Sequence, residues 1–299
     1  MSRVHDALRR AEQAGNPQAA SQNPPSAPPA GAGRPAPTPA THALVLEDVP
    51  EVSFSPAHEA LLIDASRPQD SPSEEFRSLR TRLNHLQSLQ PIHTVVVTSP
   101  SPAEGKSFSA ANLALAESQM KGNLTLLCDF DFRRPAMHNL FQIERSPGAT
   151  DYLLGQAPLA ACMKRVEGSS LYLMPAGSAV KNPLELLNLK EAKSLLQELP
   201  KTFNWVILDS PPLLFSADAN LLGTMTDGTI LVIRIGSTTI DTVHRAMQSL
   251  CENNVLGVVV NGARAGELYS KYTYYYSKYG YGERESEPEE PAPPPPEEA

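Results

Sequence analysis

Residues 93–120, "HTVVVTSPSPAEGKSFSAANLALAESQM", decide the fold class of this 299-residue chain. The stretch opens with a short apolar run, turns through serine and proline, and continues into an alanine-rich segment of helical composition. A buried strand, a turn and a helix in this order form the first half of a β-α-β unit. Between strand and helix stand Gly105, Lys106 and Ser107, the G-K-S half of a phosphate-binding loop.

Each residue type of that loop has a physical task. Glycine lets the backbone wrap so that its N–H groups point at phosphate oxygens, and the helix that follows presents its positive end to the same anion. Lys106 would reach the terminal phosphates, and the hydroxyl of Ser107 would hold Mg²⁺. The chain departs from the full G-x-x-x-x-G-K-[ST] pattern at Pro100, which replaces the outer glycine. The position of G-K-S between an apolar strand and a helix still favours a true loop.

The same alternation continues on both sides of the loop. Further aliphatic runs end in Pro, Gly or Asp, and segments with helical spacing lie between them. Buried strands that alternate with helices predict a doubly wound, mostly parallel α/β sheet, which binds ligands beyond the carboxyl ends of its strands. The predicted strands lie within residues 93–100, 123–131, 171–177, 205–212, 228–236 and 255–263, and the helices within 73–89, 106–120, 182–199 and 241–253.

Two more strand ends carry acidic residues. In "LLCDFDFRRP", Asp129 and Asp131 alternate, so we expect both carboxylates on one side of a strand, with Arg133 continuing the pattern. Paired carboxylates beside Mg²⁺ and a polyphosphate can hold the metal or accept a proton from an attacking hydroxyl. In "WVILDSPP", Asp209 follows an apolar run, as the Mg²⁺-binding aspartate of a Walker B strand does. Each motif alone is an ordinary strand end, but the three together indicate a site for Mg-ATP.

Composition divides the chain into segments and excludes several functions. Proline is concentrated near the two ends, so we expect a short amphipathic helix at 1–15, a disordered linker at 16–50 and a disordered acidic tail at 283–299. The tail supplies most of the net charge of −8, and the lack of a basic stripe argues against nucleic acid. Three scattered cysteines indicate a reducing compartment. Without a signal peptide or a long apolar run, a cytoplasmic protein is expected, reaching the membrane only through a partner.

Between a globular domain at 51–268 and the tail lies a tyrosine segment, residues 269–282, "YSKYTYYYSKYGYG". It holds seven of the nine tyrosines, among polar residues and glycines that pack poorly in a core. Its exposed phenols are either a binding surface for a glycan or partner, or acceptors for phosphate. A nearby ATP site favours the second interpretation. The candidate acceptors are Tyr269, Tyr272, Tyr274, Tyr275, Tyr276, Tyr279 and Tyr281.

The order "AEGKS", "LLCDFDFRRP", "VILDSPP" and a tyrosine-rich end resembles the bacterial tyrosine kinases that accompany exopolysaccharide and capsule synthesis. The resemblance covers about residues 60–282, and "MSRVHDALRRAE" is similar to the start of stand-alone members. It implies a MinD/ParA-like P-loop fold and an ATP- and Mg²⁺-dependent protein-tyrosine autokinase that phosphorylates its own tyrosine segment in a neighbouring subunit. The implied partners are a membrane polysaccharide co-polymerase (a chain-length determinant) as activator, other copies in a ring, a phosphatase, and sugar-nucleotide enzymes as substrates.

The resemblance also assigns roles by position. Lys106, Asp129, Asp131 and Asp209 would be catalytic, with Asp129 as the candidate base and with Ser107, Asp131 and Asp209 serving Mg²⁺. Glu74, Arg77 and Arg80 match an E-x-x-R-x-x-R motif that would join subunits, although ion pairs within one exposed helix explain the same pattern. Residues expected to bind the nucleotide are Ala103, Glu104, Gly105, Lys106, Ser107, Phe108 and Arg133, with Asn261 a weak candidate for the adenine.

Two other hypotheses remain open at this point. A switch ATPase of the MinD/ParA kind would act through partner binding, but such proteins carry a signature lysine where this chain has Ser101. A scaffold that binds nucleotide without chemistry would act through its two ends. The eukaryotic kinase signatures H-R-D, D-F-G and G-x-G-x-x-G are missing from the sequence, so any kinase activity must use the P-loop framework.

Overall fold

The computed structural model describes residues 46–54, 56, 60–64, 72–250 and 255–263. The expected N-terminal helix, most of the expected linker, the tyrosine segment with its seven candidate acceptors, and the acidic tail lie outside the described residues. Within the described ranges, none of the helices is long and apolar enough to cross a membrane.

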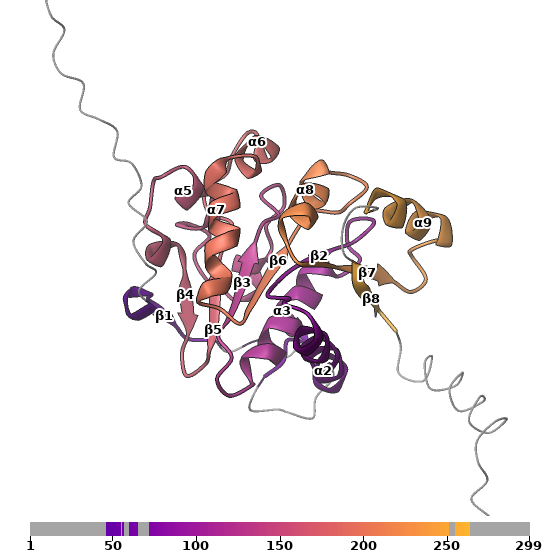
Figure 1. Cartoon of the computed structure of the whole chain (residues 1–299), viewed down its shortest axis with the longest axis horizontal. Coiled ribbons are helices and arrows are strands. Elements are labelled where there is room, and N and C mark those ends of the chain that lie inside the picture. Colours follow the sequence, from indigo (N-terminus) through magenta and orange to yellow (C-terminus); the bar gives the residue numbers. More distant parts are fainter. Residues whose placement is uncertain (1–45, 55, 57–59, 65–71, 251–254, 264–299) are drawn as a thin grey trace, which may run out of the picture. The chain divides into compact units, whose positions relative to one another are not determined.

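One eight-stranded sheet organises the described residues, in the order β1-β4-β5-β3-β6-β2-β7-β8 (Figure 1). Every neighbouring pair is parallel except β4 and β5. The mostly parallel α/β sheet that the sequence predicted is therefore confirmed. The strands are β1 (Glu51–Val52), β2 (Thr94–Thr98), β3 (Thr125–Asp129), β4 (Lys164–Val166), β5 (Leu171–Met174), β6 (Trp205–Asp209), β7 (Gly228–Arg234) and β8 (Val255–Asn261).

Helices cover the sheet on two sides, and the side chains of a strand alternate between them. In β2, Val95 and Val97 pack in the cluster that includes α2 and α3, whereas Val96 packs in the cluster that includes α7. The α-helices are α2 (Ser73–Leu89), α3 (Lys106–Ser118), α4 (Met137–Leu140), α5 (Ala149–Leu153), α6 (Pro183–Leu187), α7 (Lys190–Glu198), α8 (Ala217–Met225) and α9 (Ile240–Ser249). Short 3-10 turns lie at η1 (Leu46–Asp48), η3 (Leu159–Cys162) and η4 (Leu199–Lys201).

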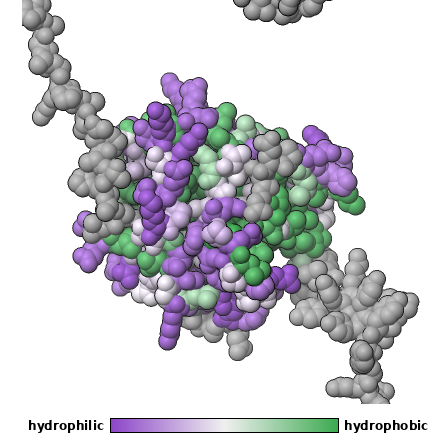
Figure 2. All heavy atoms as spheres, in the orientation of Figure 1, coloured by the Kyte–Doolittle hydropathy of each residue, from purple (hydrophilic) through white to green (hydrophobic). Residues whose placement is uncertain are grey.

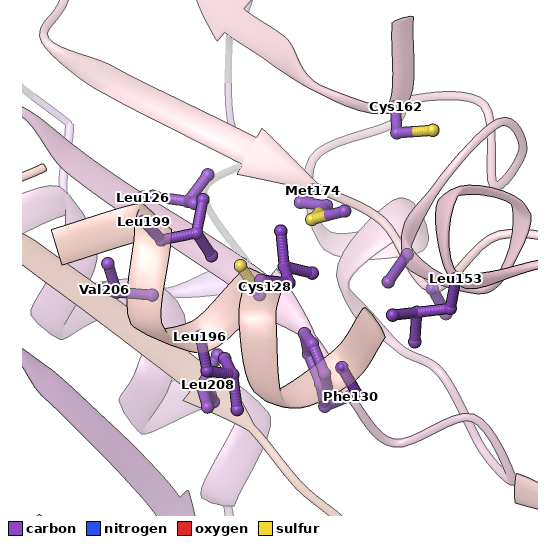
Figure 3. Close-up of a cluster of buried hydrophobic side chains, with 14 of the residues drawn as sticks. Leu126, Cys128, Phe130, Leu153, Cys162, Met174, Leu196, Leu199, Val206 and Leu208 are labelled. Atoms are coloured by element: carbon purple, nitrogen blue, oxygen red, sulfur yellow. The ribbon is translucent and has the colours of Figure 1, made fainter. Parts of the chain in front are cut away.

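The α7 side of the sheet has a dense apolar core. Figure 3 shows Cys128 of β3 and Leu208 of β6 in one apolar cluster with Leu196 and Leu199. Because strands of this kind are buried on both faces, their sequences read as continuous aliphatic runs. That property is the reason the strands next to the phosphate loop could be found in the sequence.

A polar contact joins α2 to α3 and to the start of β6. Glu117 of α3 is buried, and both of its carboxylate oxygens accept hydrogen bonds from the amide of Asn84 on α2, at 3.1 and 2.9 Å. The indole Nε1 of Trp205 donates to Oδ1 of Asn84 over 3.3 Å. One asparagine therefore links a helix pair to the sheet.

The expected helix at 182–199 is wrong as a single element, because the structure divides it. α6 ends at Leu187, and Leu189 adopts an extended conformation (φ −60°, ψ 150°) before α7 begins at Lys190. The break lets Leu186 and Leu187 of α6 and Leu195 of α7 all reach the same core cluster. Tertiary packing has overridden a leucine-rich helical pattern.

Hydrophobic residues reach the surface at the β8 end of the sheet. Val258 and Val260 are each 47% exposed. Figure 2 shows hydrophobic spheres, in green, gathered where β7 and β8 lie. Among the described strands β8 has only β7 as a neighbour, so it forms an edge of the sheet.

Candidate active site

Three adjacent strands bring the predicted motifs together at their carboxyl ends. β2 lies between β6 and β7, and β6 lies between β3 and β2. In the strand registers Val97 pairs with Asp209, and Asp209 pairs with Asp129. Because the three strands are parallel, their carboxyl ends coincide. The loop that follows β2, residues 99–105, thus faces the aspartates of β3 and β6.

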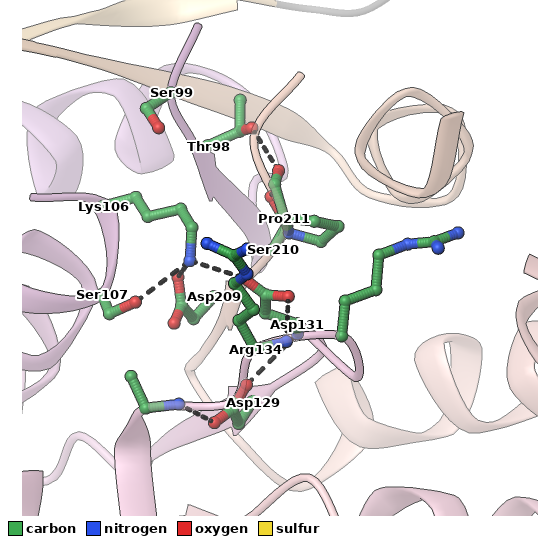
Figure 4. Close-up of polar contacts among 12 residues, drawn as sticks. Thr98, Ser99, Lys106, Ser107, Asp129, Asp131, Arg134, Asp209, Ser210 and Pro211 are labelled. Atoms are coloured by element: carbon green, nitrogen blue, oxygen red, sulfur yellow. Dashed lines mark hydrogen bonds and ion pairs between the residues drawn. The ribbon is translucent and has the colours of Figure 1, made fainter. Parts of the chain in front are cut away.

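Lys106 lies at the centre of the site that these strand ends form. It is the first residue of α3, and Figure 4 shows its ammonium group between Asp131 and Asp209. Its Nζ lies 2.8 Å from Oδ2 of Asp131 and 3.4 Å from Oδ1 of Asp209, and donates to Oγ of Ser107 over 3.1 Å. Burial opposes the charge of this lysine, but Asp209 and Asp131 outweigh it and raise the pKa of Lys106 above its ordinary value. A buried cation is therefore held where phosphate would bind.

Asp129 is fully buried and anchors the segment that follows β3. Its Oδ2 accepts hydrogen bonds from the backbone N–H groups of Ala136 and Met137, each at 3.0 Å, and its Oδ1 accepts from the N–H of Asp131 at 3.2 Å. Burial, together with the charge of Asp209, raises the pKa of Asp129 to about 7. The carboxyl group can therefore gain or lose a proton near neutral pH, while three hydrogen bonds from the backbone fix its position.

Asp131 lies beyond the strand rather than on it. β3 ends at Asp129, and the bond from the N–H of Asp131 to Asp129 turns the chain. The prediction that Asp131 and Arg133 continue the alternation of the strand is therefore wrong. The two aspartates still reach one site, because the turn directs Asp131 toward Lys106, as Figure 4 shows.

The donor set suits Mg²⁺. Oδ2 of Asp209 is buried without a hydrogen-bond partner in the described residues, which is costly unless another group, such as a cation, satisfies it. The hydroxyl of Ser107 lies beside the same carboxylate, which it helps to keep ionised although burial raises the pKa of Asp209. Magnesium prefers oxygen ligands and usually binds through one or two carboxylates together with phosphates and water. The hydroxyl and carboxylate oxygens of Ser107, Asp209 and Asp131 fit that requirement.

The loop itself has the backbone of an anion site. Gly105 has a left-handed conformation (φ 99°) immediately before α3, and within the described part of the chain no side chain caps the start of that helix. Helix N-termini carry partial positive charge and unsatisfied donors, so this end favours phosphate. The predicted contribution of Gly105 and of the backbone of residues 106–108 is consistent with this geometry.

Two predicted loop residues turn their side chains elsewhere. The carboxylate of Glu104 accepts hydrogen bonds from the N–H of Ser101 and from the hydroxyl of Thr238. The ring of Phe108 packs edge-on against Phe76 of α2, with ring centres 6.1 Å apart. A contact of Glu104 or Phe108 with a nucleotide stays a prediction.

Arg133 is engaged outside the Lys106 cluster. Its guanidinium donates two hydrogen bonds to Asp218 at the start of α8, over 2.8 and 3.2 Å, and these bonds raise the pKa of Arg133. Its side chain is 47% exposed, so an added ligand could reach it. A role for Arg133 in nucleotide binding stays a prediction.

The three residues of the expected assembly motif make contacts within their own chain. Glu74 and Arg77 form an ion pair inside α2, and Nη1 of Arg80 donates to the carbonyl of Ala116 at 2.8 Å. Glu74 remains 74% exposed in its side chain and Arg77 27%. The contacts match the interpretation of ion pairs within one helix and leave a role between subunits as a proposal.

Sequence reasoning missed several residues around the site. Asp218 of α8 binds Arg133, and the phosphate loop accepts hydrogen bonds from Arg234 of β7 and from Thr238. No sequence motif marks these residues, because each contact joins positions far apart in the chain. Asn261 was only a weak candidate for the adenine. The structure places its amide on the loop, where Nδ2 donates to the carbonyl of Glu104 over 2.9 Å.

Comparison with known proteins gives a consistent set of relatives. No protein-family model matches the chain. The tyrosine-protein kinase YwqD of Bacillus subtilis is 35% identical over 219 residues, which cover 73% of this chain and 92% of that protein. Several longer curated tyrosine-protein kinases also match, and the chain spans 31% or less of their length.

Solved structures agree with the sequence relatives. The kinase domain of the Escherichia coli tyrosine kinase ETK is 30% identical, with a TM-score of 0.62 over 67% of this chain and 79% of that chain. The chimerical protein CapA2B2 is 28% identical, with a TM-score of 0.66 over 73% of this chain and 96% of that chain.

Proposed function

This chain belongs to the bacterial tyrosine-protein kinases, and on that premise we propose that it transfers the terminal phosphoryl group of ATP to its own C-terminal tyrosines. The observation that carries the proposal is the placement of Lys106 between Asp131 and Asp209, at the N-terminus of α3. A buried lysine, a helix N-terminus and clustered carboxylates are the parts that phosphoryl transfer on a P-loop needs.

The residues of the site divide the work. The N–H groups at the start of α3 and the ammonium group of Lys106 bind and orient the phosphates and offset their charge. Ser107 and Asp209 would hold Mg²⁺, with Asp131 beside them. Bound there, the metal would supply charge neutralisation at the transferred group.

Asp129 is our choice for the group that accepts the phenolic proton. Lys106 forms ion pairs with Asp131 and Asp209, so of the three aspartates Asp129 is the one without an ion pair to a described residue. Asp129 pairs with Asp209 in the strand register, so it lies at the same strand ends as the proposed metal ligands. A base works best when it is held rigidly within reach of the hydroxyl, and three backbone bonds hold Asp129.

The tyrosine segment supplies the acceptors in this proposal. It starts a few residues beyond Asn261, the last residue of β8, and it contains seven phenols within residues 269–282. Each phosphate adds about −1.5 to −2 charges at neutral pH. Several on one segment repel one another and the acidic site, so phosphorylation would release the segment and weaken assembly between subunits.

The proposed setting is polysaccharide export at the inner face of the cell membrane. One curated relative, from Klebsiella pneumoniae, is named as a putative tyrosine-protein kinase in a cps region. By this analogy the chain would be cytoplasmic, held at the membrane by a polysaccharide co-polymerase that activates it, and assembled into a ring through Glu74, Arg77 and Arg80. A phosphatase and sugar-nucleotide enzymes complete the proposed partners.

A direct experiment tests the activity. Purified full-length protein is incubated with Mg-ATP, with and without a co-polymerase fragment, and its tail peptides are analysed by mass spectrometry. We expect phosphotyrosine within residues 269–282 in wild type, and none in Lys106→Met. Phosphate on serine instead would contradict the proposal. ATP hydrolysis without any phosphotyrosine would favour the switch ATPase.

A further inference from the structure

We infer that Glu104 is a positioning residue, and that with Thr238, Arg234 and Asn261 it forms a latch that holds the phosphate-binding loop in its working shape. The inference rests on the proposed function only in that this loop binds nucleotide. It assigns a task to four residues that are held together by hydrogen bonds across more than 100 positions of sequence.

The carboxylate of Glu104 has the wrong charge for a residue that contacts phosphate. It is 2% exposed, lies in the loop next to Gly105, and bears a negative charge that a bound anion would repel. A buried carboxylate is also costly unless its oxygens are hydrogen-bonded. Both are: Oε2 accepts from the N–H of Ser101 at 2.8 Å, and Oε1 accepts from the hydroxyl of Thr238. The side chain therefore spans the loop from within and ties it to the segment after β7.

Thr238 is fixed at the other end of that bond. Its Oγ1 accepts the backbone N–H of Arg234 at 2.9 Å while it donates to Glu104. Nη1 of the same arginine donates to the carbonyl of Ala103 at 3.3 Å. Ala103 has a left-handed conformation (φ 63°), which is unfavourable for a residue with a Cβ. Two hydrogen bonds from the β7–α9 segment thus lie beside the strained part of the loop.

Asn261 closes the latch from β8. Its Nδ2 donates to the carbonyl of Glu104 at 2.9 Å, and its Oδ1 accepts the N–H of Gly262 at 2.8 Å. A Cβ at Gly105 would lie 1.9 Å from that Nδ2, so the glycine is required by the amide as well as by its own φ of 99°. Three successive loop residues are therefore each held or covered by a side chain from β7, β8 or the segment between β7 and α9.

The consequence for phosphate binding follows from the direction of the loop's N–H groups. Their direction depends on the left-handed conformations of residues 103 and 105, and in a loop freed from the latch Ala103 would exchange its unfavourable conformation for a more favourable one. Hydrogen bonds to a buried charged group are worth about 1.5–3 kcal/mol. Loss of one such bond therefore predicts a fall in nucleotide affinity of about 10- to 100-fold.

The test measures binding of a fluorescent Mg-ADP analogue to full-length protein. Thr238→Val removes the hydroxyl at nearly constant shape, and we expect at least tenfold weaker binding. Thr238→Ser restores the hydroxyl and should recover most of the affinity. Thr224→Val, at an exposed position of α8, is the control and should bind as wild type does.

Glu104 provides a second, independent pair. Glu104→Ala removes both acceptors and should weaken binding at least as much as Thr238→Val, while Glu104→Gln keeps one acceptor and should give an intermediate affinity. In steady-state assays the latch variants should raise KM for ATP more than they lower kcat, because they alter the binding loop and leave the carboxylates in place. Melting temperatures identify any variant that fails to fold.

Two results would overturn the latch. One is wild-type affinity in both folded Thr238→Val and Glu104→Ala. The other is tighter binding in Glu104→Ala, which would mean that charge repulsion from Glu104 dominates. Because the readout is nucleotide binding, a wild-type protein that binds Mg-ADP but forms no phosphotyrosine would refute the proposed function, while the affinities of the variants would still decide the latch.

Discussion

At the scale of single residues, the three aspartates differ in what their oxygens touch. Asp129 is bonded to three backbone N–H groups, Asp131 to Lys106 and the N–H of Arg134, and Asp209 keeps one buried oxygen without a partner in the described residues. Equal charge does not give equal function here. The free oxygen belongs to the residue that we expect to bind metal, and the well-bonded carboxylate to the residue that we expect to accept a proton.

These differences predict opposite effects of two isosteric substitutions. Asp209→Asn should weaken Mg²⁺-dependent ADP binding by at least tenfold, because an amide replaces the charged metal ligand. Asp129→Asn should leave Mg-ADP affinity within about threefold of wild type but lower the phosphorylation rate by about 100-fold or more, the usual size of a general-base contribution. Binding titrations and single-turnover phosphorylation separate the two.

Both variants keep side-chain volume, and circular dichroism checks their folding. Asp129→Asn places an amide NH₂ where backbone N–H groups donate, so its melting temperature also has to be compared with that of wild type. The assignment fails if Asp209→Asn retains its Mg²⁺ dependence, or if Asp129→Asn phosphorylates at the wild-type rate.

The site residues that sequence reasoning found belong to short motifs beside strands that the sequence marks as buried. Asp129 and Asp209 are the last residues of buried strands, and Lys106 begins the helix that follows the loop after a third buried strand. Thr238 and Asp218 belong to no recognisable motif, and their partners are 134 and 85 positions away. A hydrogen bond between distant segments leaves no periodic trace in a sequence, so the latch could be seen only in three dimensions.

At the scale of elements, the contact between α2 and α3 depends on a buried acid. Burial raises the pKa of Glu117 to about 7, against the opposing effects of Asn84 and the charge of Arg80. In the unfolded chain the same group ionises near its ordinary value of 4.5. The contribution of Glu117 to stability is therefore fully present below pH 4.5 and is lost as pH rises through about 7.

Glu117→Gln should remove that loss. The amide keeps an acceptor for Asn84 and cannot ionise, so the stability of the variant relative to wild type should increase by about 2 kcal/mol between pH 5 and pH 8. Urea unfolding at the two pH values measures the difference. Glu75→Gln, on the exposed face of α2, is the control. A constant difference between variant and wild type at both pH values would contradict the prediction.

Element lengths explain which parts of the fold the sequence could predict. Strands of five to seven residues such as β2, β6 and β7 were found, because their apolar runs are long enough to recognise. β1 and β4 were missed, since two and three residues carry no usable pattern. The division of α6 from α7 at Leu189 lacks a glycine or a proline at the break, so only packing against the core reveals it.

At the scale of the whole molecule, the assembly that we propose through α2 should be separable from nucleotide binding. Glu74, Arg77 and Arg80 lie on α2, away from the contacts of Lys106. Substituting all three by alanine should convert any oligomer to monomer in light scattering after gel filtration, with Mg-ADP affinity unchanged. Arg82→Ala, an exposed arginine of the same helix outside the motif, should assemble as wild type does.

The triple variant also loses the hydrogen bond from Arg80 to the carbonyl of Ala116, so its melting temperature has to be measured. We expect the triple variant to melt a few degrees lower and to remain folded. An oligomer that persists in the triple variant would show that the internal ion pairs are the whole role of these residues.

Phosphorylation between subunits can be tested with two defective chains. One carries Lys106→Met with its tyrosines intact, and the other has phenylalanine at all seven tyrosines of residues 269–282. Each alone should form no phosphotyrosine in the tail. Mixed with Mg-ATP, they should phosphorylate the Lys106→Met chain, because only transfer in trans joins a working site to an acceptor. A mixture that stays unmodified while wild type reacts would show transfer within one chain.

The position of Trp205 gives this protein a built-in optical signal. It is the single tryptophan of the chain, 1% exposed at the start of β6, and its indole is bonded to Asn84 of α2. Emission from an indole in such surroundings moves to longer wavelength when water reaches it. Ultraviolet excitation therefore reports whether α2 stays seated, and stopped-flow fluorimetry can follow that event in milliseconds without attaching a dye.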